Sequence, residues 1–307
     1  MTERNVAVIP APTTPLLGRD DEVAQVTDLL WNPDVRLVSL LGPGGIGKTR
    51  LAIEVAWELH NGTGFADGVH LVDLATVDDP ELVPDTVARS IGVVDMGTGH
   101  DVERLCEAIR DRDMLLVLDN FEHVTPAAGF VAQLLAAAPR LSILVTSRTS
   151  LHIRGEHEIV VPALGSEEAV ELFRARARAV KPGFELTETT KPIVESICTE
   201  LDRLPLAIEL AAARSKVLSP AELLARLGSR LDGGQPVLPG QPGARNSTGT
   251  RHRFRDGDAG GTDRRDEGVC RRDVPAARAA AAGARSRRDQ RRRRDRHGGG
   301  EPVGRDR

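Results

Sequence analysis

The chain has 307 residues, 40% of them hydrophobic, which is enough for about two ordinary domains with buried cores. Its three cysteines, Cys106, Cys198 and Cys270, are too widely spaced for a disulfide framework or a metal-ligand pattern. No apolar run approaches the roughly 18 residues of a membrane span. These features exclude disulfide-rich secreted and membrane-spanning classes and predict a cytoplasmic protein that makes no membrane contact.

The modest net charge of -4 conceals two unlike parts. Residues 228–307 contain 20 arginines, no lysine and 11 acidic residues, a net charge of +9, so the first 227 residues must carry -13. Such asymmetry is typical of a basic arm that binds an acidic partner, or of an abnormal segment.

Residues 1–14 show no periodicity and predict an extended leader. Residues 15–165 then alternate apolar strands with amphipathic helices, which predicts a doubly wound parallel α/β sheet. The expected strands are 35–41, 69–74, 114–118, 141–145 and 158–161. The expected helices are 20–30, 48–59, 82–91, 102–110 and 129–138.

From residue 166 the pattern changes to helix alone, which predicts a small all-α domain over 166–230. Ser166 is a plausible N-cap of its first helix. The other three helices each have a proline near the start, a position that suits the first turn: Pro192, Pro205 and Pro220. Residues 231–307 contain too few apolar side chains to offset the entropy of ordering, and we expect them to be disordered.

A glycine-rich loop separates the first strand from the helix that follows it. It matches the P-loop pattern G-x-x-x-x-G-K-S/T in full, over Gly42, Pro43, Gly44, Gly45, Ile46, Gly47, Lys48 and Thr49. Glycines let backbone N–H groups turn towards phosphate oxygens, and the positive end of the helix adds to their attraction. Lys48 is expected on the β- and γ-phosphates and the Thr49 hydroxyl on Mg²⁺, so the cofactors are ATP or ADP with Mg²⁺.

Asp119 follows the apolar run 114–118, which we expect to lie beside the P-loop strand. A carboxylate there would hold Mg²⁺ through water, although a strand-end Asp can also simply cap a turn. The next residue, Asn120, cannot accept a proton, which argues against fast hydrolysis. Glu122 or His123 could activate water instead, or could be solvated loop residues. Arg148, after the strand 141–145, could contact the γ-phosphate or lie on the surface.

These segments in this order resemble the NB-ARC class of STAND ATPases, most of all the ATPase modules of bacterial, actinobacterial-type transcriptional activators. The resemblance covers roughly residues 15–230. It is carried by 17–22, the P-loop with 49–52, 116–123, 145–148 and the run Leu-Asp-Arg-Leu-Pro-Leu-Ala at 201–207.

The resemblance implies that Arg19 lies near the adenine, that Arg50 belongs to the binding loop and that Arg148 senses the γ-phosphate. It also implies that Pro205 touches the base or sugar and couples the two domains. Arg203 departs from the family, which usually has glycine there, so the turn before Pro205 is expected to be altered. The implied mechanism is a switch in which ADP holds a closed form and ATP permits self-association.

The resemblance also implies a winged helix and a sensor array after the helical domain, and residues 231–307 resemble neither. Three interpretations of this tail stay open: a basic arm that binds nucleic acid, a solvated linker, or the product of a reading-frame shift, which the abrupt change of composition favours. The first functional hypothesis is therefore a truncated nucleotide-dependent switch that regulates transcription. The alternatives are a steadily turning-over ATPase, a nucleic-acid-binding protein and a non-functional fragment.

Overall fold

The computed structural model describes residues 9–62, 64–93 and 101–231. Five parallel strands form one sheet in the order β2-β3-β4-β1-β5. The strands are β1 (Leu37–Leu41), β2 (Val69–Asp73), β3 (Met114–Asp119), β4 (Leu141–Ser147) and β5 (Glu156–Val160). The predicted parallel α/β fold is confirmed, and each observed strand overlaps an expected one.

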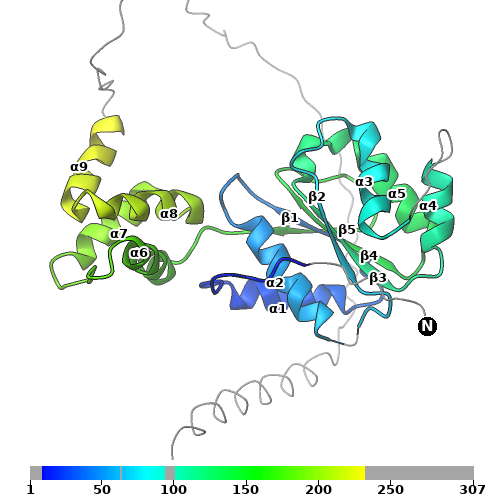
Figure 1. Cartoon of the computed structure of the whole chain (residues 1–307), viewed down its shortest axis with the longest axis horizontal. Coiled ribbons are helices and arrows are strands. Elements are labelled where there is room, and N and C mark those ends of the chain that lie inside the picture. The colour runs from blue at the N-terminus through cyan, green and yellow to red at the C-terminus, as the bar shows by residue number, and fades with distance from the viewer. Residues whose placement is uncertain (1–8, 63, 94–100, 232–307) are drawn as a thin grey trace, which may run out of the picture. The chain divides into compact units, whose positions relative to one another are not determined.

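Helices cover both faces of this sheet (Figure 1). One face carries α1 (Asp20–Leu30) and α2 (Lys48–His60), and the other carries α3 (Val83–Ser90), α4 (Asp101–Ile109) and α5 (Ala128–Ala137). Short 3-10 turns lie at Pro80–Leu82, Phe121–His123, Thr125–Ala127 and Arg214–Lys216. The three-layer arrangement explains why the three inner strands β1, β3 and β4 are buried along their whole lengths and are largely apolar, since helices cover both faces of the sheet there.

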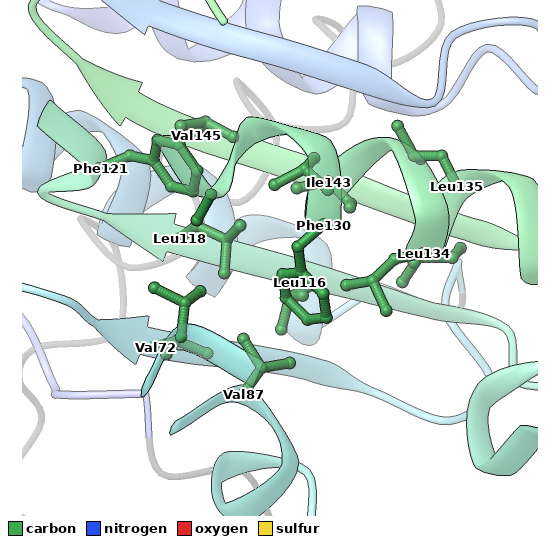
Figure 2. Packing of buried hydrophobic residues seen from close by; sticks show 14 of the residues in the cluster. Val72, Val87, Leu116, Leu118, Phe121, Phe130, Leu134, Leu135, Ile143 and Val145 are labelled. Carbon is green, nitrogen blue, oxygen red and sulfur yellow. The ribbon is translucent and has the colours of Figure 1, made fainter. Parts of the chain in front are cut away.

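Alternate side chains of β3 enter the two cores. Leu116 and Leu118 pack with α3 and α5, while Leu115 and Val117 pack with α1 and α2. Figure 2 shows Leu116 and Leu118 among Phe121 and other side chains of the first core. All six residues of β3 are buried, so the strand that ends at Asp119 is held rigidly from both sides.

The helical region contains α6 (Ser166–Val180), α7 (Lys191–Glu200), α8 (Pro205–Ala213) and α9 (Pro220–Leu231). Its own core includes Phe173, Cys198 and Ile208. The described residues of the helical region and those of the sheet region belong to one compact unit. A domain boundary at residue 165 stays a prediction, and the predicted disorder of 231–307 falls, past Leu231, outside the described residues.

Two local predictions were wrong. Ser166 is the first helical residue of α6, not its N-cap; the cap position is Gly165, which has no side chain that could accept a hydrogen bond. The strand that ends at Asp119 does not lie beside the P-loop strand, because β4 is inserted between β3 and β1. Within the described part of the chain, none of the helices has the length and hydrophobicity that a bilayer crossing demands.

Candidate functional site

The glycine-rich loop connects the carboxyl end of β1 to the first turn of α2. Gly45 and Gly47 have φ angles of 81° and 99°, a left-handed region that strains any other residue. Among the described residues, the N–H groups of Gly44, Gly45 and Gly47 donate no hydrogen bond. Together with the free N–H groups of the first turn of α2, they form a set of donors suited to an anion.

Lys48 folds back over this loop. Its Nζ donates to the carbonyl oxygens of Gly42 at 2.8 Å and Pro43 at 3.2 Å. Burial lowers the pKa of Lys48, the nearby carboxylate of Glu122 opposes that effect, and the Arg148 guanidinium adds to it. The ammonium group therefore lies within electrostatic reach of Glu122, in the turn after β3, and of Arg148, which follows β4.

The carboxylate of Asp119 is almost fully buried and is held on both oxygens. Its Oδ1 accepts from Thr49 Oγ1 at 2.9 Å and from Thr146 Oγ1 at 2.6 Å, and its Oδ2 accepts from Asn120 Nδ2 at 3.1 Å. Burial raises the pKa of Asp119, and the hydrogen bonds from Thr146 and Thr49 act against that rise. A hydroxyl and a carboxylate 2.9 Å apart are the hard oxygen ligands that suit Mg²⁺.

The inserted strand β4 explains why Thr146 belongs to this cluster. Because β4 lies between β1 and β3, Thr146 near its carboxyl end bridges from Asp119 to the backbone N–H of Asn120, which donates to Thr146 Oγ1 at 2.9 Å. Sequence reasoning missed Thr146 as a site residue. The available signal was a polar residue in an apolar strand, two positions before Arg148.

Asn120 redirects the chain after β3. Its φ of 62° is left-handed, a conformation that asparagine tolerates better than most residues. Its side-chain amide donates to Asp119 and to Asp73 Oδ1 at 3.2 Å, so it braces two carboxylates and leaves no base at that position. The 3-10 turn that follows buries Phe121 completely.

Glu122, in the 3-10 turn after β3, and Arg148, directly after β4, form an ion pair. Arg148 Nε donates to Glu122 Oε1 at 3.2 Å, and the Glu122 side chain is only 12% exposed whereas that of Arg148 is 61% exposed. A Cβ built on Gly44 would lie 3.6 Å from Arg148 Nη2, so the guanidinium lies over the phosphate loop. His123, the other candidate base, is exposed.

The start of α8 touches the same loop. The N–H of Leu206 donates to the carbonyl of Gly45 at 3.2 Å, and a Cβ on Gly47 would lie 3.9 Å from Pro205 Cγ. A Cβ on Gly45 would approach Leu206 Cβ to 3.0 Å, a second reason for glycine there. Pro205 therefore lies at the loop, on the side of the helical region.

The turn before Pro205 is formed without glycine. Asp202 and Arg203 have φ angles of 52° and 53°, both left-handed. The N–H of Arg203 donates to Cys198 O at 2.9 Å and that of Asp202 to Thr199 O at 3.0 Å, the two bonds of a Schellman motif that ends α7. Arg203, where the resemblance implies glycine, therefore completes this helix end with a left-handed backbone that is strained for a residue with a Cβ, and a turn altered relative to the family stays a prediction.

A pocket of about 50 Å³ lies beside the loop and is lined by residues of both regions. Arg19, Arg50 and Pro205, predicted to bind nucleotide, line it together with Arg176 and Glu209, which the sequence did not indicate. Arg176 Nη2 donates to Glu209 Oε1 at 2.8 Å.

The two predicted arginines are anchored to backbone. The buried guanidinium of Arg19 donates to the carbonyls of Pro162 at 2.7 Å and Ile46 at 3.3 Å. Arg50 donates to Thr14 O at 2.8 Å and to its hydroxyl at 3.0 Å. Arg19 and Arg50 therefore shape the pocket wall.

A parallel sheet, a glycine loop and an Asp–Thr pair at its carboxyl edge define a P-loop NTPase. The NB-ARC domain model matches residues 19–181, and the chain belongs to this family of nucleotide-binding domains.

A Mycobacterium tuberculosis protein, provisionally named an HTH-type transcriptional regulator, is 44% identical over 190 residues, 61% of this chain and 21% of that protein. Regulatory protein AfsR of Streptomyces coelicolor is 28% identical over 225 residues, 68% of this chain and 22% of AfsR. The chain thus spans about a fifth of the length of either relative. The solved structure of the Aeropyrum pernix ORC2 protein with ADPNP and ADP shares the fold, with a TM-score of 0.51 at 16% identity over 74% of each chain.

Proposed function

We propose that this chain is the nucleotide switch of a transcription regulator, in which ATP or ADP bound with Mg²⁺ sets the position of the helical region. The observation that carries the proposal is the hydrogen bond from Leu206 N–H to Gly45 O. The phosphate loop is hydrogen-bonded directly to the first turn of α8. Exchange of ADP for ATP in the loop would therefore alter the contacts of the helical region. A ligand shifts a two-state equilibrium only through such differential contacts.

Each phosphate ligand has a place in this scheme. The N–H groups of the loop and Lys48 would hold the β-phosphate, Thr49 and Asp119 would hold Mg²⁺, and Arg148 would contact the γ-phosphate. The donor set fits these groups, since unpaired N–H groups and two cations surround the loop. The magnesium supplies charge neutralisation when bound, while the protein supplies position.

The pocket beside the loop supports a movement that accompanies binding. At about 50 Å³ it is far smaller than the roughly 300–1,000 Å³ of typical ligand pockets. Its walls come from both regions, so a nucleoside that enters it must displace α6 or α8, or the segment around Thr14. A nucleoside in this pocket would then contact Pro205 of the helical region together with Arg50 and Arg19.

We expect slow hydrolysis. The Asn120 amide donates to Asp119 and Asp73, and Glu122, the carboxylate in the turn that follows, has one oxygen engaged by Arg148. Glu122 is the remaining catalytic candidate, and turnover well below about 1 per second would fit a switch, whereas many cycles per second would favour a working ATPase. Self-association in the ATP form and nucleic-acid binding through residues 231–307 stay predictions.

The test is the nucleotide content of the freshly purified full chain, released by denaturation and separated by chromatography. We expect near-stoichiometric ADP in the wild type. Lys48→Ala should lose it and bind added ADP about 100-fold more weakly, since a charge-assisted contact contributes roughly 1.5–3 kcal/mol.

Lys191→Ala, which removes an exposed lysine of α7 paired with Glu195, is the matched control and should retain ADP. A wild-type chain that is empty and fails to bind added ATP or ADP would overturn the proposal.

A further inference from the structure

Three charged side chains from separate elements meet over the phosphate loop. Lys48 belongs to α2, Glu122 to the turn after β3, and Arg148 follows β4. Arg148 Nε is 3.2 Å from Glu122 Oε1, and Glu122 and Arg148 each lie close enough to Lys48 to influence its charge. The single carboxylate of Glu122 thus attracts both Lys48 and Arg148. A terminal phosphate bound here would add a second negative charge beside it.

Glu122 and Arg148 differ in their freedom to move. Glu122 Oε2 is buried and has no hydrogen-bond partner among the described residues. Its backbone follows the completely buried Phe121, so the carboxylate is held in place. Arg148 is mostly exposed, and a guanidinium on a long side chain can exchange partners at little cost. When the pair separates, Arg148 is the member that moves.

We propose that Glu122 is a built-in competitor of the γ-phosphate: Arg148 must leave Glu122 to bind the terminal phosphate, and the fixed carboxylate then repels that phosphate. ADP leaves the ion pair intact, whereas ATP must break it. The pair therefore biases the site towards ADP and sets how much ATP is needed to trigger the switch. This inference rests on the proposed function, and it gives Glu122 a regulatory role.

The opposite role makes the opposite prediction. If Glu122 held Arg148 ready for the γ-phosphate, its loss would weaken ATP relative to ADP. If the pair were only a surface contact, its loss would change neither affinity, as for many exposed ion pairs. The sign of the change in selectivity therefore separates the three cases.

The experiment measures the affinities of the full chain for ADP and for a non-hydrolysable ATP analogue, both with Mg²⁺, by titration calorimetry. We expect Glu122→Gln, which keeps the shape and removes the charge, to shift the affinity ratio about tenfold towards the triphosphate. Arg148→Gln should shift it towards ADP. In the double variant, Glu122→Gln should change the logarithm of the affinity ratio by less than half as much as it does when Arg148 is present, because no arginine is left to be released.

Glu171→Gln is the matched control, since it removes the carboxylate of another Glu–Arg pair, on α6, and should leave the ratio unchanged. Thermal melts of each variant check that the fold is retained. A ratio in Glu122→Gln that stays within twofold of wild type, or moves towards ADP, overturns the inference alone. A wild type that binds neither nucleotide overturns the proposed function and this inference with it.

Discussion

The phosphate loop is contacted by the sheet region on one side and by the helical region on the other, and the two sets of contacts differ. On the sheet side, β1, β3 and β4 are buried along their whole lengths, and Asp119 receives hydrogen bonds on both oxygens. On the helical side, the described contacts with the loop come from Leu206, whose N–H donates to Gly45 and whose side chain lies beside that glycine although the residue is 51% exposed, and from the ring of Pro205.

The difference matches two separate tasks. A site that must place charges accurately needs a rigid frame, because small displacements weaken charge-assisted contacts sharply. An element that reports the occupant needs a contact that can break, since elements that move are drawn from the weakly held parts of a structure. The sheet region fits the first task and the helical region the second.

The largest expected effect concerns the core of the helical region. Cys198 is 2% exposed, and burial raises its pKa to about 11 from 9.0, so at pH 8 its thiolate fraction should be roughly 100-fold below that of an unfolded chain. We expect iodoacetamide to label native Cys198 at least that much more slowly than in denaturant. The chain for this assay carries Cys106→Ser and Cys270→Ser, which leaves Cys198 as its single thiol.

The same pKa fixes a pH dependence. Between pH 9 and about 11 the unfolded thiol ionises and the folded one does not, so the unfolded state binds fewer protons and stability falls as pH rises. The gap between native and denatured labelling rates should narrow over that interval. Equal rates at pH 8 would mean that the helical region opens freely and is not a folded unit in solution.

A smaller effect should follow from trimming the Leu206 side chain, which lies against Gly45 of the loop. If nucleotide and helical region are coupled, ADP at a hundred times its dissociation constant can slow Cys198 labelling by up to about 100-fold. Leu206→Ala keeps the backbone N–H that donates to Gly45 and removes the side-chain atoms beyond Cβ that lie beside that glycine, so we expect it to reduce this protection to a few fold while retaining ADP binding. Leu210→Ala, on the next turn of α8 and 62% exposed, is the matched control. Equal loss of protection in both variants would argue against a specific role for Leu206.

The smallest effect lies in the turn before Pro205. Arg203 holds a left-handed φ of 53°, which costs a residue with a Cβ roughly 1–2 kcal/mol. Arg203→Gly should relieve the strain and, after the added entropy of unfolded glycine, stabilise the chain by about 0.5–1 kcal/mol. Arg203→Ala keeps the Cβ and should not stabilise. Thermal melts of both variants test this, and equal melting temperatures would show that the turn is unstrained.

Much of the molecule follows from local sequence. Alternating apolar strands and helices predicted the parallel sheet, because both faces of every inner strand must be buried. The loop from Gly42 to Thr49 was readable because its chemistry needs glycine, lysine and threonine at fixed offsets between a strand and a helix. Asp119 was found for a similar local reason, as a carboxylate at the end of a buried strand. The roles of these residues stay predictions until nucleotide binding is measured.

What tertiary structure alone decided is which of these residues meet. The insertion of β4 between β1 and β3 depends on how helices pack across the sheet, so no local pattern places Thr146 against Asp119. The left-handed turn at Asn120 brings Glu122 to Arg148, 26 residues further along the chain. The bond from Leu206 to Gly45 likewise joins segments far apart in sequence. Sequence periodicity reports which face of an element is buried, whereas the partner of that face is selected by long-range packing.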